Sequence, residues 1–241
     1  MRNLPLAIAL IALIAPSAMS PSALAGERRI VLKEYVGRQW TNELLSYPFD
    51  AARGECHEDS LRLEGPNGPR AAQLSDIEYW PGTRTVKSAR LWFVADLEPL
   101  AEDAYTVRYG PDAARERARG DLTVTVDARQ MEATGSRFGA RLRLGREQLD
   151  EPRAASEGPG PVVALRLADG TWFGGSRMFG KTRISAWSAE PTASGPVFAA
   201  VDYIYHYEGG NELKLRALLY EGAAGLRCET QVARDARDDG F

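Results

Sequence analysis

A period-two alternation over residues 196–220 constrains the fold of this 241-residue chain more than any other feature. From Val197 to Tyr207 every second residue is apolar or aromatic, which is the spacing of one face of a β-strand. Glu208-Gly209-Gly210-Asn211 then has the residue types of a tight turn, and the alternation resumes at Leu213. The sequence therefore predicts a long β-hairpin. Because no segment has helical periodicity over more than about three turns, we expect an all-β chain.

The amino terminus has the three parts of a secretory signal peptide. Arg2 supplies positive charge, Leu4–Ala15 is apolar, and Ala23-Leu24-Ala25 is a small-x-small cleavage site. The apolar run is too short to span a bilayer comfortably. We expect residues 1–25 to be removed, which leaves a secreted or periplasmic protein without a membrane span; an uncleaved anchor is the alternative.

Charge and cysteine content narrow the classes of partner. The formal net charge is −3, so no basic excess favours nucleic acid or an anionic membrane. In an oxidising compartment Cys56 and Cys228 could pair. We favour two separate, buried thiols, because the two cysteines fall in different predicted domains.

Residues 26–111 consist of short β-prone segments separated by Pro and Gly turns. This spacing is typical of a small barrel or sandwich, and we expect a small β-barrel. The run Leu91–Ala95 is apolar on both faces and is predicted to be its central buried strand. The expected strands are 29–36, 43–47, 61–63, 71–74, 77–80, 88–95 and 104–109.

Residues 112–120 are rich in alanine and alternating charge, and we expect them to link two domains. Residues 121–241 are predicted to form an antiparallel β-sandwich, in which Pro, Gly, Glu and Ser make 150–161 a surface loop. Because the chain ends soon after a strand at 225–232, we expect this sandwich to be truncated. The other expected strands are 122–126, 129–134, 140–144, 162–167, 171–173 and 184–190.

Gly175–Thr182 matches the phosphate-binding pattern G-x-x-x-x-G-K-[ST]. That pattern binds phosphate only between a buried parallel strand and a helix, whose amino terminus supplies the donors. A strand-like segment follows here instead. We therefore interpret the match as a glycine-rich turn, and expect neither a nucleotide nor another cofactor.

Catalytic and metal-binding patterns are weak. His57 and His206 lie far apart in the sequence, whereas a zinc site needs three or four converging ligands. His57 follows Cys56 directly, and adjacent side chains point apart. Glu190 and Asp202 could face each other as a glycosidase pair does, which is the least favoured hypothesis.

Aromatic residues gather between positions 172 and 207. Aromatic rings stack on sugar rings, although most large aromatics are buried in cores. Trp172 and Trp187 flank the glycine-rich turn, and Arg177, Lys181 and Arg183 place positive charge beside them. We predict that these five residues bind carbohydrate.

Several segments resemble exo-rhamnogalacturonan lyase-like proteins. The resemblance implies an amino-terminal β-barrel of the RIFT type, a central β-sandwich and a carboxy-terminal α/α toroid. The toroid is absent from this chain, and no catalytic residue can be transferred. The resembling segments are Val31–Glu34, Gly37–Leu44, Val86–Phe93, Tyr105–Gly110, Trp172–Gly175, Trp187–Glu190 and Gly195–Phe198.

These observations favour a non-catalytic function. We expect the amino-terminal portion of a secreted polysaccharide lyase-like protein, which packs against a missing catalytic domain or feeds polysaccharide to it. The alternative is an autonomous secreted module that binds carbohydrate or a cell-surface partner.

Overall fold

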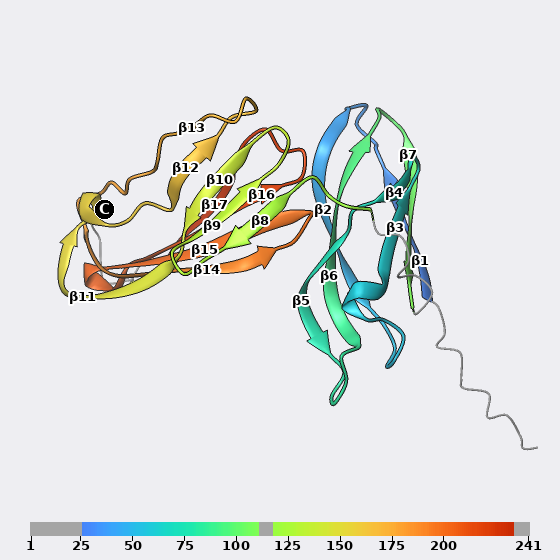
Figure 1. Cartoon of the computed structure of the whole chain (residues 1–241), viewed down its shortest axis with the longest axis horizontal. Coiled ribbons are helices and arrows are strands. Elements are labelled where there is room, and N and C mark those ends of the chain that lie inside the picture. The colour runs from blue at the N-terminus through green and yellow to red at the C-terminus, as the bar shows by residue number, and fades with distance from the viewer. Residues whose placement is uncertain (1–25, 111–117, 234–241) are drawn as a thin grey trace, which may run out of the picture.

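The computed structural model describes residues 26–110 and 118–233 (Figure 1). The predicted signal peptide and most of the predicted linker lie outside these residues. The described chain is all-β, as expected, with four antiparallel sheets and no α-helix. Three single-turn 3-10 helices, η1 (Glu58–Ser60), η3 (Ala155–Glu157) and η4 (Glu208–Gly210), connect strands. No helix in the described ranges is both long and apolar enough to cross a membrane.

Residues 26–110, here called the amino-terminal unit, form two sheets that pack face to face. One has the order β1-β7-β3-β4 and the other β2-β6-β5. The strands are β1 (Gly26–Lys33), β2 (Trp40–Asp50), β3 (Leu61–Gly65), β4 (Gly68–Arg70), β5 (Gln73–Tyr79), β6 (Val86–Leu97) and β7 (Glu102–Tyr109).

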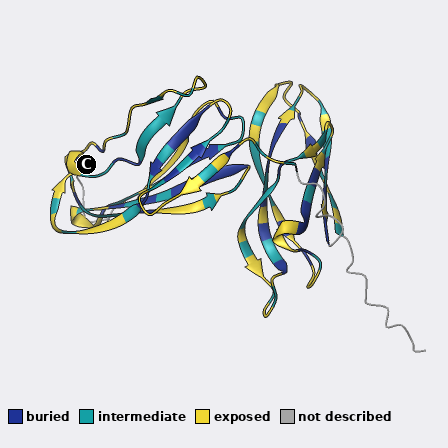
Figure 2. Ribbon diagram, in the orientation of Figure 1, coloured by how far each residue is buried: buried dark blue, intermediate teal, exposed yellow. Residues whose placement is uncertain are grey.

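The two sheets do not close into a barrel, so the β-barrel expected for this unit is not formed. A barrel needs continuous strand pairing, and here no ladder joins the edge strands of one sheet to those of the other. The unit is therefore sandwich-like. Strand β6 lies at the centre of its sheet, and Leu91, Phe93 and Ala95 on it are buried, which confirms the predicted central strand. Figure 2 shows buried residues along the inner faces of both units.

Residues 118–233, the carboxy-terminal unit, form two five-stranded sheets around a second core. Their orders are β13-β12-β10-β9-β8 and β11-β14-β15-β16-β17. The strands are β8 (Thr123–Val126), β9 (Gln130–Thr134), β10 (Gly139–Arg143), β11 (Gly145–Ala154), β12 (Val162–Arg166), β13 (Trp172–Phe173), β14 (Arg183–Ser194), β15 (Phe198–Tyr207), β16 (Glu212–Tyr220) and β17 (Arg227–Ala233).

The predicted hairpin is formed by β15, η4 and β16. Its apolar face carries Tyr203 and Tyr205, both fully buried, so the period-two alternation did mark the core side of a strand. Positive φ angles at Gly209 and Gly210 allow the chain to reverse there. At the start of β15 the opposite face is also buried, because Phe198 and Ala200 contact the amino-terminal unit.

Several predicted boundaries were wrong. Residues 71–74 and 77–80, expected as two strands, fall mostly within the single strand β5. Residues 150–154 belong to β11, although 150–161 was expected to be a loop. This strand lies at the edge of its sheet, where an interrupted register between Gln148 and Arg153 tolerates Pro152. Strand β14 also continues beyond Pro191 to Ser194, because a β-bulge between Pro191 and Ala193 accommodates the proline.

The two units meet where β2, β5 and β6 face the start of β15 and the end of β16 (Figure 1). The ring centroids of Trp92 and Phe198 are 4.7 Å apart. Gln73 Oε1 accepts hydrogen bonds from the backbone N–H groups of Val197 (3.1 Å) and Phe198 (3.0 Å). Apolar contacts and directional hydrogen bonds thus join the units.

Candidate functional site

The two predicted tryptophans lie in opposite sheets of the carboxy-terminal unit. Trp172 is half-buried in β13, and the Arg141 guanidinium lies 4.0 Å from its ring centroid, so a cation covers one face of the ring. Trp187 in β14 packs against the core, and its Nε1 donates to Glu147 Oε2 at 3.2 Å. Both rings already have protein neighbours.

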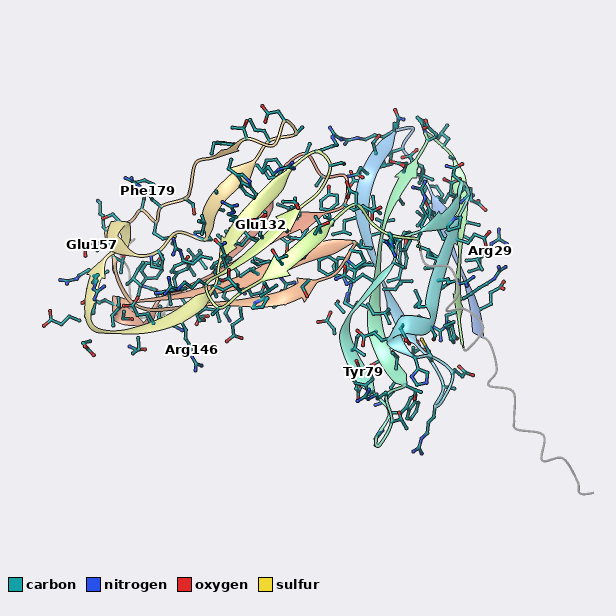
Figure 3. The ribbon with its side chains drawn as sticks, in the orientation of Figure 1. Arg29, Tyr79, Glu132, Arg146, Glu157 and Phe179 are labelled. Carbon is teal, nitrogen blue, oxygen red and sulfur yellow. The ribbon has the colours of Figure 1, made fainter. Side chains whose placement is uncertain are left out.

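The three predicted basic residues lie along the connection between these tryptophans. Arg177 and Lys181 are exposed, in the segment between β13 and β14. Arg183 begins β14, where its guanidinium donates to the carbonyl of Pro152. Phe179 in the same segment is 81% exposed (Figure 3). Carbohydrate binding by the five residues stays a prediction.

The segment that matches the phosphate-binding pattern is followed by strand β14 and not by a helix. Ser176 ties this segment to β12, because its Oγ accepts a hydrogen bond from the N–H of Val162 at 2.7 Å. The segment therefore connects two strands in different sheets. The amino-terminal helical donors that the pattern requires do not follow it.

The carboxylates of Glu190 and Asp202 are cross-strand neighbours on β14 and β15. Arg216 donates two hydrogen bonds of 2.7 Å to Asp202, so this carboxylate is held in a bidentate ion pair. His206 Nδ1 lies 3.4 Å from Glu212 Oε2. Within residues 26–110 and 118–233, no three His, Cys, Asp or Glu side chains are grouped as metal ligands, and no disulfide joins Cys56 to Cys228. Cys56 is buried as expected, but Cys228 is exposed because it lies on the edge strand β17.

A groove that the sequence did not predict lies at one end of the amino-terminal unit. It has a volume of about 590 Å³ and is bordered by β1, β2, β6 and the loop of residues 34–39. We call it the aromatic groove, because three aromatic side chains contribute to it. Its lining residues are Val31, Leu32, Lys33, Glu34, Tyr35, Val36, Trp40, Glu43, Leu45, Tyr47, Ala95 and Leu97.

Glu34 fixes the shape of the aromatic groove. Its buried carboxylate accepts hydrogen bonds from the N–H groups of Val36 (2.9 Å), Gly37 (2.7 Å) and Leu100 (3.0 Å). Burial alone would raise the pKa of this carboxyl, but the donated hydrogen bonds outweigh it and lower the pKa to about 2. A carboxylate that is charged at neutral pH thus joins the loop 34–39 to the loop 98–101.

The backbone at this position is strained. Leu100 has a φ of 58°, a conformation that costs a branched non-glycine residue free energy, and its side chain is 70% exposed. An exposed apolar side chain in a strained conformation contributes little to the core.

Two aromatic rings of the groove are open to solvent. Tyr35 is 76% exposed and Trp40 is 36% exposed. Each has one positioned cation: Lys33 Nζ lies 5.6 Å from the Tyr35 centroid, and the Arg38 guanidinium 5.0 Å from the Trp40 centroid. Tyr47 is half-buried and stacks on Phe93 at 5.9 Å. The arrangement offers ring surface beside groups that hydrogen-bond.

Sequence reasoning missed this site because it assigned residues 29–36 to one strand. The strand ends at Lys33, and Glu34 turns the chain toward a loop that is distant in sequence. Gly37, whose φ is 73°, is a sequence signal for a loop, but it does not show that the strand already ends at Lys33. Nothing in the sequence places residues 98–101 beside it.

Neither a scan against family models nor a search of the curated proteins gave a match. The resemblance to exo-rhamnogalacturonan lyase-like proteins therefore stays a prediction.

Proposed function

We propose that this chain is a non-catalytic carbohydrate-binding part of a secreted polysaccharide-degrading system, and that the aromatic groove binds the polysaccharide. The observation that carries this proposal is the pair of exposed rings, Tyr35 and Trp40, held beside one groove by the Glu34 hydrogen bonds. Sugar rings have flat apolar faces that stack on aromatic side chains.

Polar groups at the margin suit the hydroxyls that surround such a face. Lys33 and Glu43 line the groove, and Arg38 lies beside Trp40. Lys33 is held by Glu102 at 3.1 Å, so its ammonium group has a defined position. A few placed polar groups among apolar and aromatic ones are the usual composition of a ligand-binding surface.

A glycan array of the purified mature chain is the first test, because it identifies the polysaccharide class. With the best ligand, Tyr35→Ala and Trp40→Ala should each raise the dissociation constant roughly two- to twelve-fold, since each removes one stacked ring. Tyr79→Ala is the matched control: Tyr79 is also exposed and lies at the opposite end of the same unit (Figure 3).

The outcomes separate the competing sites. If Trp172→Ala or Trp187→Ala abolishes binding and the groove variants do not, the carbohydrate site is the one predicted from sequence. If no glycan binds, the proposal is wrong. The exposed Tyr35, Val36 and Leu100 would then be candidates for contact with a protein such as a catalytic domain.

A further inference from the structure

We infer that a second binding site, for a compact oxyanion group such as a phosphate, sulfate or carboxylate, lies where the β1-β7-β3-β4 sheet meets the carboxy-terminal unit. A pocket of about 310 Å³ is present at this junction. Arg62, Arg70 and Arg108 line it from the amino-terminal unit, and Ala118 and Pro196 line it from the other unit. The aromatic groove shares no lining residue with it.

Strand register places two of these arginines side by side. Arg62 on β3 is directly opposite Arg108 on β7, and like charges at such positions destabilise a sheet. Arg108 is compensated by Glu27 at 3.1 Å and by Glu64 at 3.2 Å. No carboxylate in the described residues lies within ion-pair distance of Arg62, so the compensation covers only one of the two guanidinium groups.

The Arg62 guanidinium also has an unused donor. Its Nε is buried, and no hydrogen-bond acceptor lies within reach among the described residues. A buried donor without an acceptor costs free energy, which an acceptor entering the pocket would recover. The planar guanidinium offers a fork of N–H groups that matches the oxygens of an oxyanion.

The residues that line the pocket carry more positive than negative charge, which favours an anion. Glu64 is the acidic residue that lines it, and this carboxylate is held by Arg108. Arg70 lowers the pKa of Glu221 across the junction without forming an ion pair with it, so its charge also acts on the pocket. Leu61, Ala72 and Pro196 supply apolar wall that limits water and strengthens a charge-assisted hydrogen bond.

Titration calorimetry with inorganic phosphate tests the inference, at an ionic strength held constant with chloride. We expect saturable binding, and Arg62→Gln or Arg70→Gln should each weaken it by about ten-fold or more. Arg29→Gln is the matched control, because Arg29 is an exposed arginine of the same sheet outside the pocket (Figure 3). Parallel titrations with sulfate and acetate distinguish a tetrahedral group from a carboxylate.

Arg62→Lys keeps the positive charge but lacks the planar pair of guanidinium N–H donors. Its affinity for the anion should therefore lie between those of the wild type and Arg62→Gln. Circular dichroism at the titration temperature checks that each variant is folded. If Arg62→Gln is unfolded, Arg70→Gln still tests the pocket. The inference is overturned if none of the three anions binds saturably, or if Arg29→Gln weakens binding as much as the pocket variants do.

Discussion

The carboxylate of Glu34 joins two loops that are 66 residues apart through its hydrogen bond to Leu100. This single side chain binds the backbone N–H groups of Val36 and Gly37, while the side chains of Tyr35 and Val36 are exposed. It accepts hydrogen bonds from three backbone N–H groups, and a glutamine would turn an amide N–H₂ group toward some of these donors. Glu34 is therefore a positioning residue for the aromatic groove.

Glu34→Gln should lower the free energy of unfolding at pH 7 and weaken glycan binding. The folded-state pKa of Glu34 is lowered from 4.5 to about 2, so its stabilising contribution is present above pH 4.5 and disappears as the pH falls toward 2. Urea unfolding at several pH values should show that the difference between wild type and Glu34→Gln shrinks across this window. A difference that is constant from pH 7 to pH 2 would contradict the assigned role.

At the scale of elements, the β15–β16 hairpin organises the carboxy-terminal unit. The hydroxyls of Tyr203 and Tyr205 donate to the carbonyls of Pro161 and Pro159, both at 2.9 Å, and so attach the segment before β12 to β15. Burial raises the pKa of both tyrosines well above 10, so the hydroxyls stay protonated donors at physiological pH. The two rings stack with centroids 6.4 Å apart.

Tyr203→Phe should destabilise the protein by about 1 kcal/mol, because the hydrogen bond from the hydroxyl to the Pro161 carbonyl is lost while the packing volume is kept. The carbonyl keeps its second donor, the N–H of Arg143 at 2.8 Å. Tyr35→Phe is the control. Because Tyr35 is exposed, the same substitution there should change the free energy of unfolding by no more than about 0.5 kcal/mol. Chemical denaturation of both variants measures the difference. Equal effects would mean that the Tyr203 hydroxyl does not hold this segment.

The elements that the sequence marked most clearly were those with a buried face, although β17, which is exposed throughout, was also predicted, at 225–232. The alternation at Tyr203 and Tyr205 and the apolar run at Leu91–Ala95 report burial directly, so the hairpin and β6 were predicted correctly. Strand β11 was missed, because an edge strand exposed on most of its length has no apolar face to mark it. The aromatic groove was missed because it depends on which loops meet, and that is decided by long-range packing.

At the scale of the whole molecule, the contact between the units contains a half-buried acid, Glu221. Glu221 Oε2 is buried, and within the described chain it has no hydrogen-bond partner. Burial and the nearby charge of Asp121 raise the pKa of Glu221 to about 7, although Arg70 of the other unit opposes this. Asn42 Nδ2 donates to the backbone carbonyl of Glu221 at 3.2 Å, so this residue is part of the contact between the units.

The raised pKa of Glu221 predicts that stability falls as the pH rises from 4.5 to 7. The folded state binds the proton more tightly than the unfolded state, so the stabilisation is complete below pH 4.5 and is lost through the folded-state pKa. In the wild type we expect the free energy of unfolding to fall by roughly 1–2 kcal/mol over this range, a value already reduced for solvent screening. Glu221→Gln should remove this pH dependence. Urea midpoints at pH 5 and pH 8 measure it; equal pH dependence in both proteins would contradict the assignment.

The central claim is that carbohydrate binds beside Trp40, and nitrogen-15 NMR of the indole N–H groups tests it most directly. The five tryptophans, Trp40, Trp80, Trp92, Trp172 and Trp187, give one indole signal each and are distributed over both units. On titration with the best oligosaccharide from the array, we predict that the Trp40 signal shifts with a saturable dependence while those of Trp172 and Trp187 stay in place. A shift at Trp172 or Trp187 with none at Trp40 would contradict the claim.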